Sequence, residues 1–360
     1  MQPLRIAQVA PLVARVPPPV EGGTERVVHD LVEALDARGH RVTLFAADGS
    51  ITRASLAPMG PAQADDPGAP RSALAVRELA MLDAVRRRAD EFDIVHCHTE
   101  FAHAAVLREL GPRLVATLHW RTDQADRQTL FARFPELRTI ALSRSQAGPV
   151  PRASLAGIVP HGIGRDRYAL VERPDGHCVF LGRMTDQKRP DRAVRIAADA
   201  GIDIVLGGDR DPGNPAYFER EVAPRLGERA RYAGPVPESA KQDFLGRARA
   251  LLFPIDWPEP FGLVMIEAMA CGTPVVAWRR GSAAEVVDEG VTGFVVDSHE
   301  DAVRALRDAC ALDRGRVRER FEERFTSARM AAGHEAVYRR LIDAPPSASD
   351  ARAERGAMLA

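Results

Sequence analysis

Apolar runs of strand length alternate with amphipathic helical segments along this chain, and the series begins twice. The first series opens with LRIAQVA at Leu4–Ala10, and the second opens with HCVFLGRM at His177–Met184. Strands that alternate with helices form parallel sheets with right-handed crossovers. The pattern therefore predicts an α/β protein of two Rossmann-like, doubly wound domains that face each other across a cleft, with ligands at the carboxyl ends of the strands.

A length of 360 residues also exceeds one ordinary hydrophobic core and fits two domains. We place the boundary near Gly164–Leu170, so that the first domain covers residues 1–165 and the second covers residues 166–342. The stretch 48–70 is rich in Pro, Ala, Gly and Asp and predicts an exposed loop. The Pro-, Ser- and Ala-rich end, residues 343–360, is expected to fray.

The composition argues against several classes of protein. The formal net charge of −1 creates no strong field for nucleic acid or anionic lipid, and no stretch reaches the roughly 20 apolar residues that a membrane span needs. The four cysteines are scattered without a CxxC pair, which argues against a disulfide framework or a zinc ribbon and favours a reducing, cytoplasmic location. The sequence does not indicate an oligomeric state.

The segment EPFGLVMIEAMACGTPVV places a carboxylate, Glu267, in an otherwise apolar helix. Such a helix is buried, and an unpaired charge in it is costly. We expect the helix to begin at Pro260–Leu263, where free backbone N–H groups suit an anion and Gly262 permits close approach. Glu267 could then accept hydrogen bonds from vicinal ribose hydroxyls, and Glu259 could face a sugar. The alternative is that Glu267 pairs with a core arginine while Glu259 is exposed.

A second polar segment, FLGRMTDQKRP, follows the first strand of the second half. The strand is expected to end at Gly182, so that Arg183 and Lys188 project from the loop before the next helix. Arginine supplies a fork for two oxygens and lysine supplies a point charge, as in a phosphate clamp. Taken alone, such a segment is more often a pair of solvated loop cations.

The glycine pair Gly22-Gly23 lies before the first helix and could bring backbone N–H groups to a phosphate or a sugar. Such a pair is more often a turn than a site. The absence of a GxGxxG motif lowers the case for a nicotinamide cofactor.

The first half also contains four histidines close together: His96, His98, His103 and His119. His96 and His98 share one face of a strand because they are two residues apart. No HExxH pattern accompanies them, so histidines of the core or the cleft are favoured over a metal site. His119 ends the strand LVATLHW, where an imidazole could bind a sugar hydroxyl or share a proton.

These motifs, in this order, resemble glycosyltransferase family 4, the retaining GT-B enzymes, over nearly the whole chain. The segment EGGTERVVHDLVEALDARGHRVTLFA resembles the family's GGxE segment, and VPHGI resembles its interdomain stretch with His161 in place of the common Asn. LGRMTDQKRPDRAV is similar to the donor-phosphate segment. EPFGLVMIEAMACGTPVVA matches the E-x7-E motif, which is the most specific feature. RFTSARMAAGHEAVYRRLI is similar to the closing helix, which crosses back to the first domain.

The resemblance implies a role for each matching residue. Arg183 and Lys188 would bind the donor diphosphate, Glu267 would hold the ribose, and Glu259 would contact the transferred sugar. The nucleobase would lie near Tyr232–Val236. The catalytic residues would be His119, Arg183, Lys188 and Glu259. The substrate-binding residues would be Gly22, Gly23, His98, Gly182, Arg183, Lys188, Val236, Glu259, Phe261, Gly262, Leu263 and Glu267.

The function that follows is transfer of a hexose, with retention, from UDP-glucose or a related UDP-hexose to an unidentified hydroxyl acceptor. The resemblance implies no metal and no cofactor beyond the donor, which is a substrate. Three alternatives stay open. The first is a metal-dependent GT-A transferase that uses the DxD sequence Asp209-Arg210-Asp211. The second is a nucleotide-sugar epimerase of the same fold, and the third is a non-catalytic nucleotide-sugar binding protein.

Overall fold

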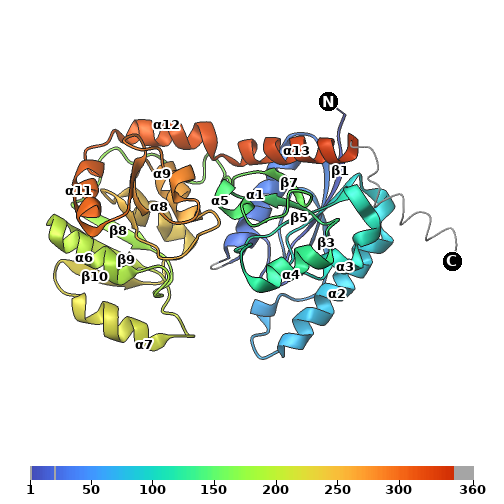
Figure 1. Ribbon diagram of the computed structural model, residues 1–360, viewed down its shortest axis with the longest axis horizontal. Coiled ribbons are helices and arrows are strands. Elements are labelled where there is room, and N and C mark those ends of the chain that lie inside the picture. Colours follow the sequence, from blue (N-terminus) through green and yellow to red (C-terminus); the bar gives the residue numbers. More distant parts are fainter. Residues whose placement is uncertain (1, 20–21, 344–360) are drawn as a thin grey trace. The chain divides into compact units, whose positions relative to one another are not determined.

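The computed structural model describes residues 2–19 and 22–343, and the chain divides into two units (Figure 1). Unit 1 comprises Met1–Gly162 together with Ser327–Ala360, and unit 2 comprises Ile163–Thr326. The closing helix therefore belongs to unit 1, whereas the sequence-based range 166–342 ended with this helix and had it cross back to the first domain. Most of the tail that was expected to fray lies outside the described residues, and Asp343 is the last residue of the closing helix.

The sheet of unit 1 is entirely parallel and has the strand order β3-β2-β1-β4-β5-β6-β7. Its strands are short and lie at the positions of the apolar runs. They are β1 Arg5–Val9, β2 Arg41–Ala46, β3 Ser55–Pro58, β4 Ile94–Cys97, β5 Leu114–Thr117, β6 Arg138–Ala141 and β7 Leu155–Ile158. The helices are α1 Gly23–Ala37, α2 Arg71–Arg87, α3 His103–Val106, α4 Ala125–Arg133, α5 Arg144–Ala147 and α13 Ser327–Asp343.

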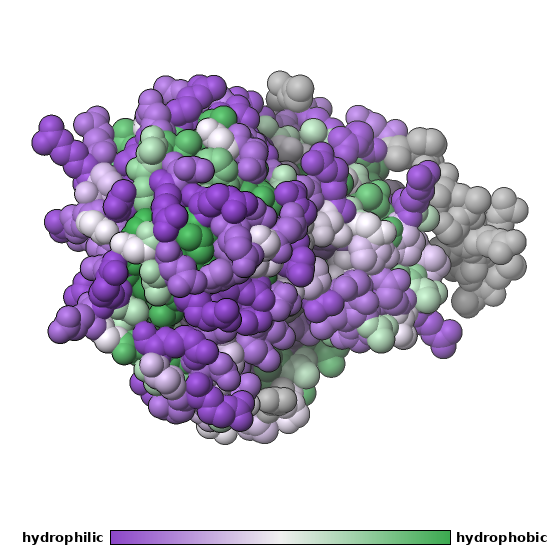
Figure 2. All heavy atoms as spheres, turned by 60° about the vertical axis from the view of Figure 1, so that its left-hand side comes forward, coloured by the Kyte–Doolittle hydropathy of each residue, from purple (hydrophilic) through white to green (hydrophobic). Residues whose placement is uncertain are grey.

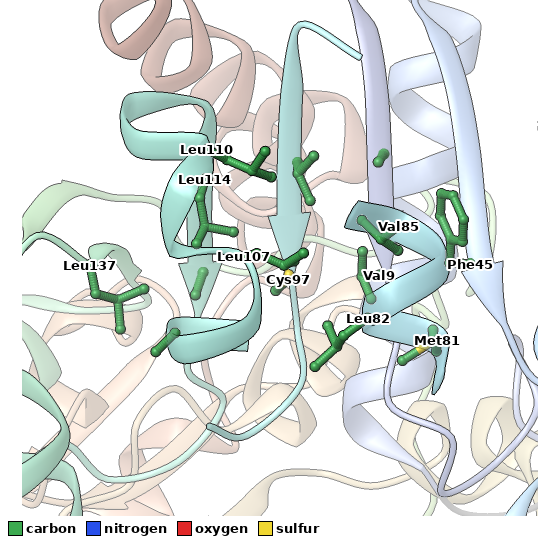
Figure 3. Packing of buried hydrophobic residues seen from close by; sticks show 14 of the residues in the cluster. Val9, Phe45, Met81, Leu82, Val85, Cys97, Leu107, Leu110, Leu114 and Leu137 are labelled. Carbon is green, nitrogen blue, oxygen red and sulfur yellow. The ribbon is translucent and has the colours of Figure 1, made fainter. Parts of the chain in front are cut away.

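Alternate residues of these strands face opposite layers of helices, as the period of two requires. One face carries an apolar cluster with α2, α3 and α4. Figure 3 shows Val9, Phe45 and Cys97 of the strands beside Leu82 and Val85 of α2. The other face lies beneath α1 and α13, which pack against each other. This second face is less apolar, and it carries the histidines described below.

The sheet of unit 2 is also entirely parallel, with the order β10-β9-β8-β11-β12-β13. Its strands are β8 His177–Leu181, β9 Asp203–Gly207, β10 Ala230–Gly234, β11 Leu251–Phe253, β12 Val275–Trp278 and β13 Gly293–Val296. Helices α6 Pro190–Ala200 and α11 His299–Ala309 pack together, as do α9 Leu263–Ala270 and α12 Arg314–Arg324. The remaining helices are α7 Pro215–Tyr217, α8 Glu238–Gly246 and α10 Ala283–Val286.

The stretch 48–70 differs from the prediction, because it is not only an exposed loop. Residues Ser55–Pro58 form the edge strand β3, which pairs in parallel with β2, and Gln63–Asp65 form a 3-10 turn. Only Ala57 of the four β3 residues is buried. A short edge strand with Pro and Ala gives no alternating apolar signal, so the pairing with β2 decides its conformation.

Hydrophilic side chains cover most of the face seen in Figure 2, and hydrophobic side chains show between them. Within residues 2–19 and 22–343, no helix is both long enough and apolar enough to cross a bilayer. The four cysteines are free thiols, and three of them are buried.

Candidate active site

The two sheets each have a switch point, where neighbouring strands continue into connections that leave in opposite directions. In unit 2 it lies between β8 and β11, and in unit 1 it lies between β1 and β4. Ligands of open α/β sheets bind at the carboxyl ends of the strands at such points. The segments that follow β8 and β11 are FLGRMTDQKRP and EPFGLVMIEAMA, so the topology of unit 2 brings together the two motifs singled out from the sequence.

Lys188 and Glu259 meet at this point as an ion pair between Nζ and Oε2. The indole Nε1 of Trp257 also donates to Oε2 of Glu259 at 2.8 Å. The ammonium lies 5.0 Å from the ring centroid of Trp257, within the range of a cation–π contact. Because both charged side chains are largely buried, they are not the solvated loop charges of the alternative interpretation.

Arg183 differs from Lys188, because its side chain is exposed beyond the end of β8. Its guanidinium has no ion-pair partner among the described residues, which leaves all five donors for a ligand anion. The backbone before it is held in place, because the amide of Gly182 donates to the carbonyl of Gly207 at 3.0 Å. A Cβ atom at Gly208 would lie 2.1 Å from the oxygen of Gly182, so this approach of two chains requires glycine.

Helix α9 begins at Leu263, the last residue of the predicted start Pro260–Leu263. Gly262 has φ 84, in the left-handed region, and caps the helix. A side chain at Gly262 would also crowd Met265, whose Cε would be 2.8 Å from a new Cβ. The loop before the helix is fixed from the segment after β12. Ser282 Oγ donates to the carbonyl of Phe261 at 2.6 Å, and the amide of Ser282 donates to the carbonyl of Glu259 at 3.0 Å.

Glu267 is 4% exposed, and its partner is a lysine where the alternative interpretation expected an arginine. Lys241 of α8 donates to its Oε1 at 2.9 Å, and Lys241 also pairs with Glu238 at 3.2 Å. Burial by itself would lower the pKa of Lys241, but the two carboxylates outweigh burial and raise it. Lys241 could not be predicted from the sequence as the partner of Glu267, because it lies 26 positions away on a different helix.

The region expected to hold the nucleobase is tied to the same loops. Val236 is buried, and its side chain packs on the backbone of Gly207, where a Cβ would be 2.6 Å from Cγ2 of Val236. Tyr232 donates its hydroxyl to the carbonyl of Gly208 at 2.8 Å. The ends of β8, β9 and β10 are therefore held together around Gly207-Gly208.

In unit 1, the segments at the switch point are the glycine pair at the start of α1, with Gly22 as the cap and Gly23 as the first helical residue, and the histidines after β4 and β5. Gly22 caps α1 with an extended backbone, and a Cβ there would lie 2.8 Å from Cβ of Pro18. His98 and His119 are joined by a hydrogen bond of 2.9 Å between Nδ1 and Nε2. The ring of His119 also stacks on that of His161, with 5.3 Å between centroids. His119 is thus held at the carboxyl edge of this sheet.

Three more buried histidines lie in unit 1 near this pair, at two separate places. The ring of His96 lies between those of His98 and His334 in the interior, whereas His103 is apart and bonds to Thr99 Oγ1 at 3.0 Å. Burial lowers the pKa of His119 to about 3 and that of His334 to about 4. Across the described part of the chain, no three His, Cys, Asp or Glu side chains are arranged to hold a metal ion.

Two parallel sheets with helices on both faces, each with polar groups at its switch point, define a GT-B-type protein, and comparison with known proteins agrees. Residues 21–153 match the family described as Glycosyltransferase Family 4, and residues 172–326 match Glycosyl transferases group 1. The chain belongs to glycosyltransferase family 4, as the sequence motifs indicated.

Curated relatives include the D-inositol 3-phosphate glycosyltransferases of Mycobacterium tuberculosis and Mycobacterium bovis. They are 37% identical over 168 residues, which is 44% of this chain and 33% of theirs. The chain therefore matches about a third of the length of these relatives.

Solved structures share the fold over nearly the whole chain. AviGT4, a glycosyltransferase involved in avilamycin A biosynthesis, has a TM-score of 0.74 and 24% identity, and the match covers 95% of this chain and 99% of AviGT4. Sucrose-phosphate synthase from Thermosynechococcus elongatus also has a TM-score of 0.74, at 22% identity with 95% and 100% covered. The Anabaena protein HepE, solved with UDP and glucose, has a TM-score of 0.69 at 19% identity with 92% and 98% covered. The predicted class of fold is confirmed, and the GT-A alternative, which requires a different fold, is set aside.

Proposed function

We propose that this protein is a retaining glycosyltransferase that moves a hexose from UDP-glucose, or a related UDP-hexose, to a hydroxyl group of an acceptor. The observation that carries the proposal is the gathering of Arg183, Lys188, Glu259 and the start of α9 at the switch point of unit 2. Cations, a helix N-terminus and a carboxylate in one place match a ligand that has a diphosphate on one side and hydroxyl groups on the other.

In this proposal the donor's diphosphate binds to Arg183, Lys188 and the first amides of α9. Lys188 exchanges its contact with Glu259 for a phosphate oxygen, and Glu259 becomes available to the hydroxyls of the sugar. Glu267 uses its second carboxylate oxygen for the ribose, while Lys241 keeps the first. The ion pairs thus hold the charged groups near the positions in which they act.

Glycosyl transfer passes through an oxocarbenium-like transition state, and negative charge grows on the departing diphosphate. Fixed donors aimed at that charge are often the largest contribution to catalysis. We assign Arg183, Lys188 and the amides at Phe261–Leu263 to this role, so the reaction requires no metal. A phosphate oxygen of the donor takes the proton of the acceptor hydroxyl on the same face of the sugar, and no covalent nucleophile is assigned.

The solved structures of HepE with UDP-glucose and with UDP and glucose support the choice of donor, because a protein of the same fold binds that ligand. The mycobacterial relatives support a transferase as such. They do not decide the acceptor, since the match covers only part of those proteins.

The test is turnover with a panel of UDP-, GDP- and ADP-sugars, each with and without a set of candidate acceptors. We expect loss of a UDP-hexose that requires an acceptor, and NMR of the product should show the anomeric configuration of the donor. A donor converted without acceptor would indicate the epimerase. Binding of UDP-sugars without loss, whatever acceptor is offered, would indicate the non-catalytic binding protein.

A further inference from the structure

The face of the unit 1 sheet that lies beneath α13 carries a line of buried polar side chains. Gln8 of β1 and His96 of β4 are register partners, and His98 lies two residues beyond His96. Tyr338 of α13 reaches this face and is fully buried. None of these side chains is more than 5% exposed, so each polar group must find its partner within the protein.

The side chains form one continuous set of hydrogen bonds that ends at His119. We call this set the relay. Its bonds are Thr117 Oγ1 to His96 Nε2 at 2.8 Å, His96 Nδ1 to Tyr338 OH at 2.7 Å, Tyr338 OH to Gln8 Nε2 at 3.0 Å, Gln8 Oε1 to His98 Nε2 at 2.8 Å, and His98 Nδ1 to His119 Nε2 at 2.9 Å.

The amide of Gln8 gives the relay a direction, because its oxygen can only accept and its nitrogen can only donate. The oxygen faces His98, so Nε2 of His98 carries the proton of that ring. A neutral imidazole has one proton, which leaves Nδ1 of His98 as an acceptor. Nε2 of His119 must therefore donate to it, and Nδ1 of His119 keeps its lone pair.

The nitrogen of Gln8 determines the direction of the bonds towards Tyr338, His96 and Thr117. The nitrogen of Gln8 donates to the hydroxyl oxygen of Tyr338, so the proton of Tyr338 is directed to Nδ1 of His96. His96 then carries its own proton on Nε2 and donates to Thr117. With the amide of Gln8 in this orientation, each of the five bonds joins one donor to one acceptor, as a buried polar network requires.

The rings of His98 and His119 are both neutral at physiological pH. Burial, together with the neighbouring histidines, holds the pKa of His98 well below its ordinary value, and burial lowers the pKa of His119 to about 3. Nδ1 of His119 has no hydrogen-bond partner within the described residues. It is also not one of the buried polar atoms that lack a partner, so solvent reaches it.

We propose that the relay fixes His119 in a single tautomer, with Nε2 protonated and Nδ1 presented as a hydrogen-bond acceptor. Gln8, His98 and Tyr338 are then positioning residues that act through His119. The atom of a ligand that meets Nδ1 must be a donor, such as a sugar hydroxyl, and an oxygen of a phosphate or a carboxylate is disfavoured there. This consequence for the ligand rests on the proposed function, whereas the tautomer does not.

The first test is the tautomer in the full-length, ligand-free protein. With 15N-labelled histidine, two-bond 1H–15N correlation spectra at neutral pH distinguish protonated from unprotonated ring nitrogens. We expect His119, His98 and His96 each to be protonated on Nε2 only. A proton on Nδ1 of His119, or a mixture of its two tautomers, would overturn the proposal without reference to any activity.

The second test removes the hydroxyl that accepts the hydrogen bond from the amide nitrogen of Gln8. In Tyr338→Phe, the nitrogen of Gln8 loses its acceptor and either orientation of the amide becomes available, so we expect a second tautomer of His119 to appear. The control is Tyr217→Phe in unit 2, which deletes a buried hydroxyl that donates to Asp191 Oδ1 at 2.6 Å. A single, unchanged tautomer of His119 in folded Tyr338→Phe would contradict the proposal, and if that variant does not fold, the wild-type spectrum still decides.

The kinetic readout separates this proposal from the proposed function. Tyr338→Phe should lower kcat/KM with a UDP-hexose about two- to tenfold, which is the scale of one neutral hydrogen bond, and should leave the Kd of UDP unchanged. Tyr217→Phe should change neither. If no sugar nucleotide is turned over but His119 shows the single tautomer, the relay stands and the assignment as a transferase fails.

Discussion

At the scale of single residues, two glutamates that share one motif have different partners, which predicts different roles. Glu259 pairs with Lys188, a ligand group of the proposed diphosphate site, whereas Glu267 pairs with Lys241 deeper in the unit. We expect Glu267→Ala to weaken UDP itself by about 10- to 100-fold, because hydrogen bonds to a charged group contribute roughly 1.5–3 kcal/mol. Glu259→Ala should weaken a UDP-hexose more than UDP.

Calorimetry with UDP and with the UDP-hexose measures both variants against the same two ligands. Glu267→Gln is the matched control, since it keeps the shape of the side chain and removes only its charge. Equal losses for the two ligands in both alanine variants would mean that the glutamates do not divide the nucleotide and the sugar between them.

For His119 we expect a loss of turnover without a loss of nucleotide binding. The reason is that His119 belongs to unit 1, whereas the residues of the proposed nucleotide site belong to unit 2. His119→Ala should lower kcat by about 100-fold, at the lower end of the range for a positioned side chain that shares a proton. The Kd of UDP should stay within about twofold of wild type. The control is His299→Ala in unit 2, where the histidine pairs with Asp199 at the surface and turnover should be unchanged. Wild-type kcat in His119→Ala would return this histidine to a structural role.

At the scale of elements, Glu335 joins α13 to the connection between α1 and β2, where Arg38 and His40 lie, and it also bonds to Arg339 of α13 itself. Arg38 donates to Glu335 at 2.6 Å, Arg339 does so at 2.8 Å, and His40 lies at 3.4 Å. Burial by itself would raise the pKa of Glu335, but the bonds from the two arginines outweigh it and lower the pKa to about 2 from an ordinary value of 4.5. The ionised carboxylate therefore stabilises the docked helix.

A pKa that is lower in the folded state contributes stability above the unfolded pKa, and this contribution disappears as the pH falls towards the folded value. We expect the unfolding free energy to decline between about pH 4.5 and about pH 2 more steeply in the wild type than in Glu335→Gln. Denaturant titrations of both proteins at a series of pH values give the difference between their unfolding free energies. The contribution of the other carboxylates cancels in this difference. Parallel curves would show that Glu335 does not hold α13 through its charge.

At the scale of the whole molecule, the source of positive charge at the diphosphate separates this protein from metal-dependent transferases. Activity should persist in excess EDTA and should depend on Arg183 and Lys188. Loss of a charged partner of a phosphate typically costs about 2–5 kcal/mol, or about 30- to 5000-fold in rate. Arg183→Ala should fall in that range, and Arg183→Lys should not restore full activity because a point charge cannot reproduce the fork.

Asp209→Ala is the matched control for this experiment, since Asp209 begins the DxD sequence that a metal-dependent enzyme would need. The side chain of Asp211 already accepts the amide of Gly213 at 3.0 Å, as in a local turn. Initial rates at saturating donor compare the variants. Activity that EDTA abolishes and manganese restores, together with an inactive Asp209→Ala, would contradict the proposed mechanism.

The sequence by itself determined the class of fold and the order of the motifs. The period of two in the strands, the apolar stripe of each helix and the glycines at the turns are local signals, and each can be recognised within about 15 residues. Gly262 is an example, because a glycine before an apolar helix already indicates the start of that helix. The sequence predicted the start of the helix to within one helical turn, and the structure shows that α9 begins at the residue after Gly262.

Only the tertiary structure decided which polar groups meet. Lys241 neutralises Glu267 from another helix, Lys188 pairs with Glu259 across two loops, and Tyr338 completes a hydrogen-bond relay with Gln8 across 330 positions of sequence. The partner of a buried charge or hydroxyl is chosen by which elements pack together, and no local pattern encodes that choice. Sequence patterns could therefore indicate candidate donor-binding residues, whereas the protonation and orientation of His119 follow from the packing of α13 on the sheet.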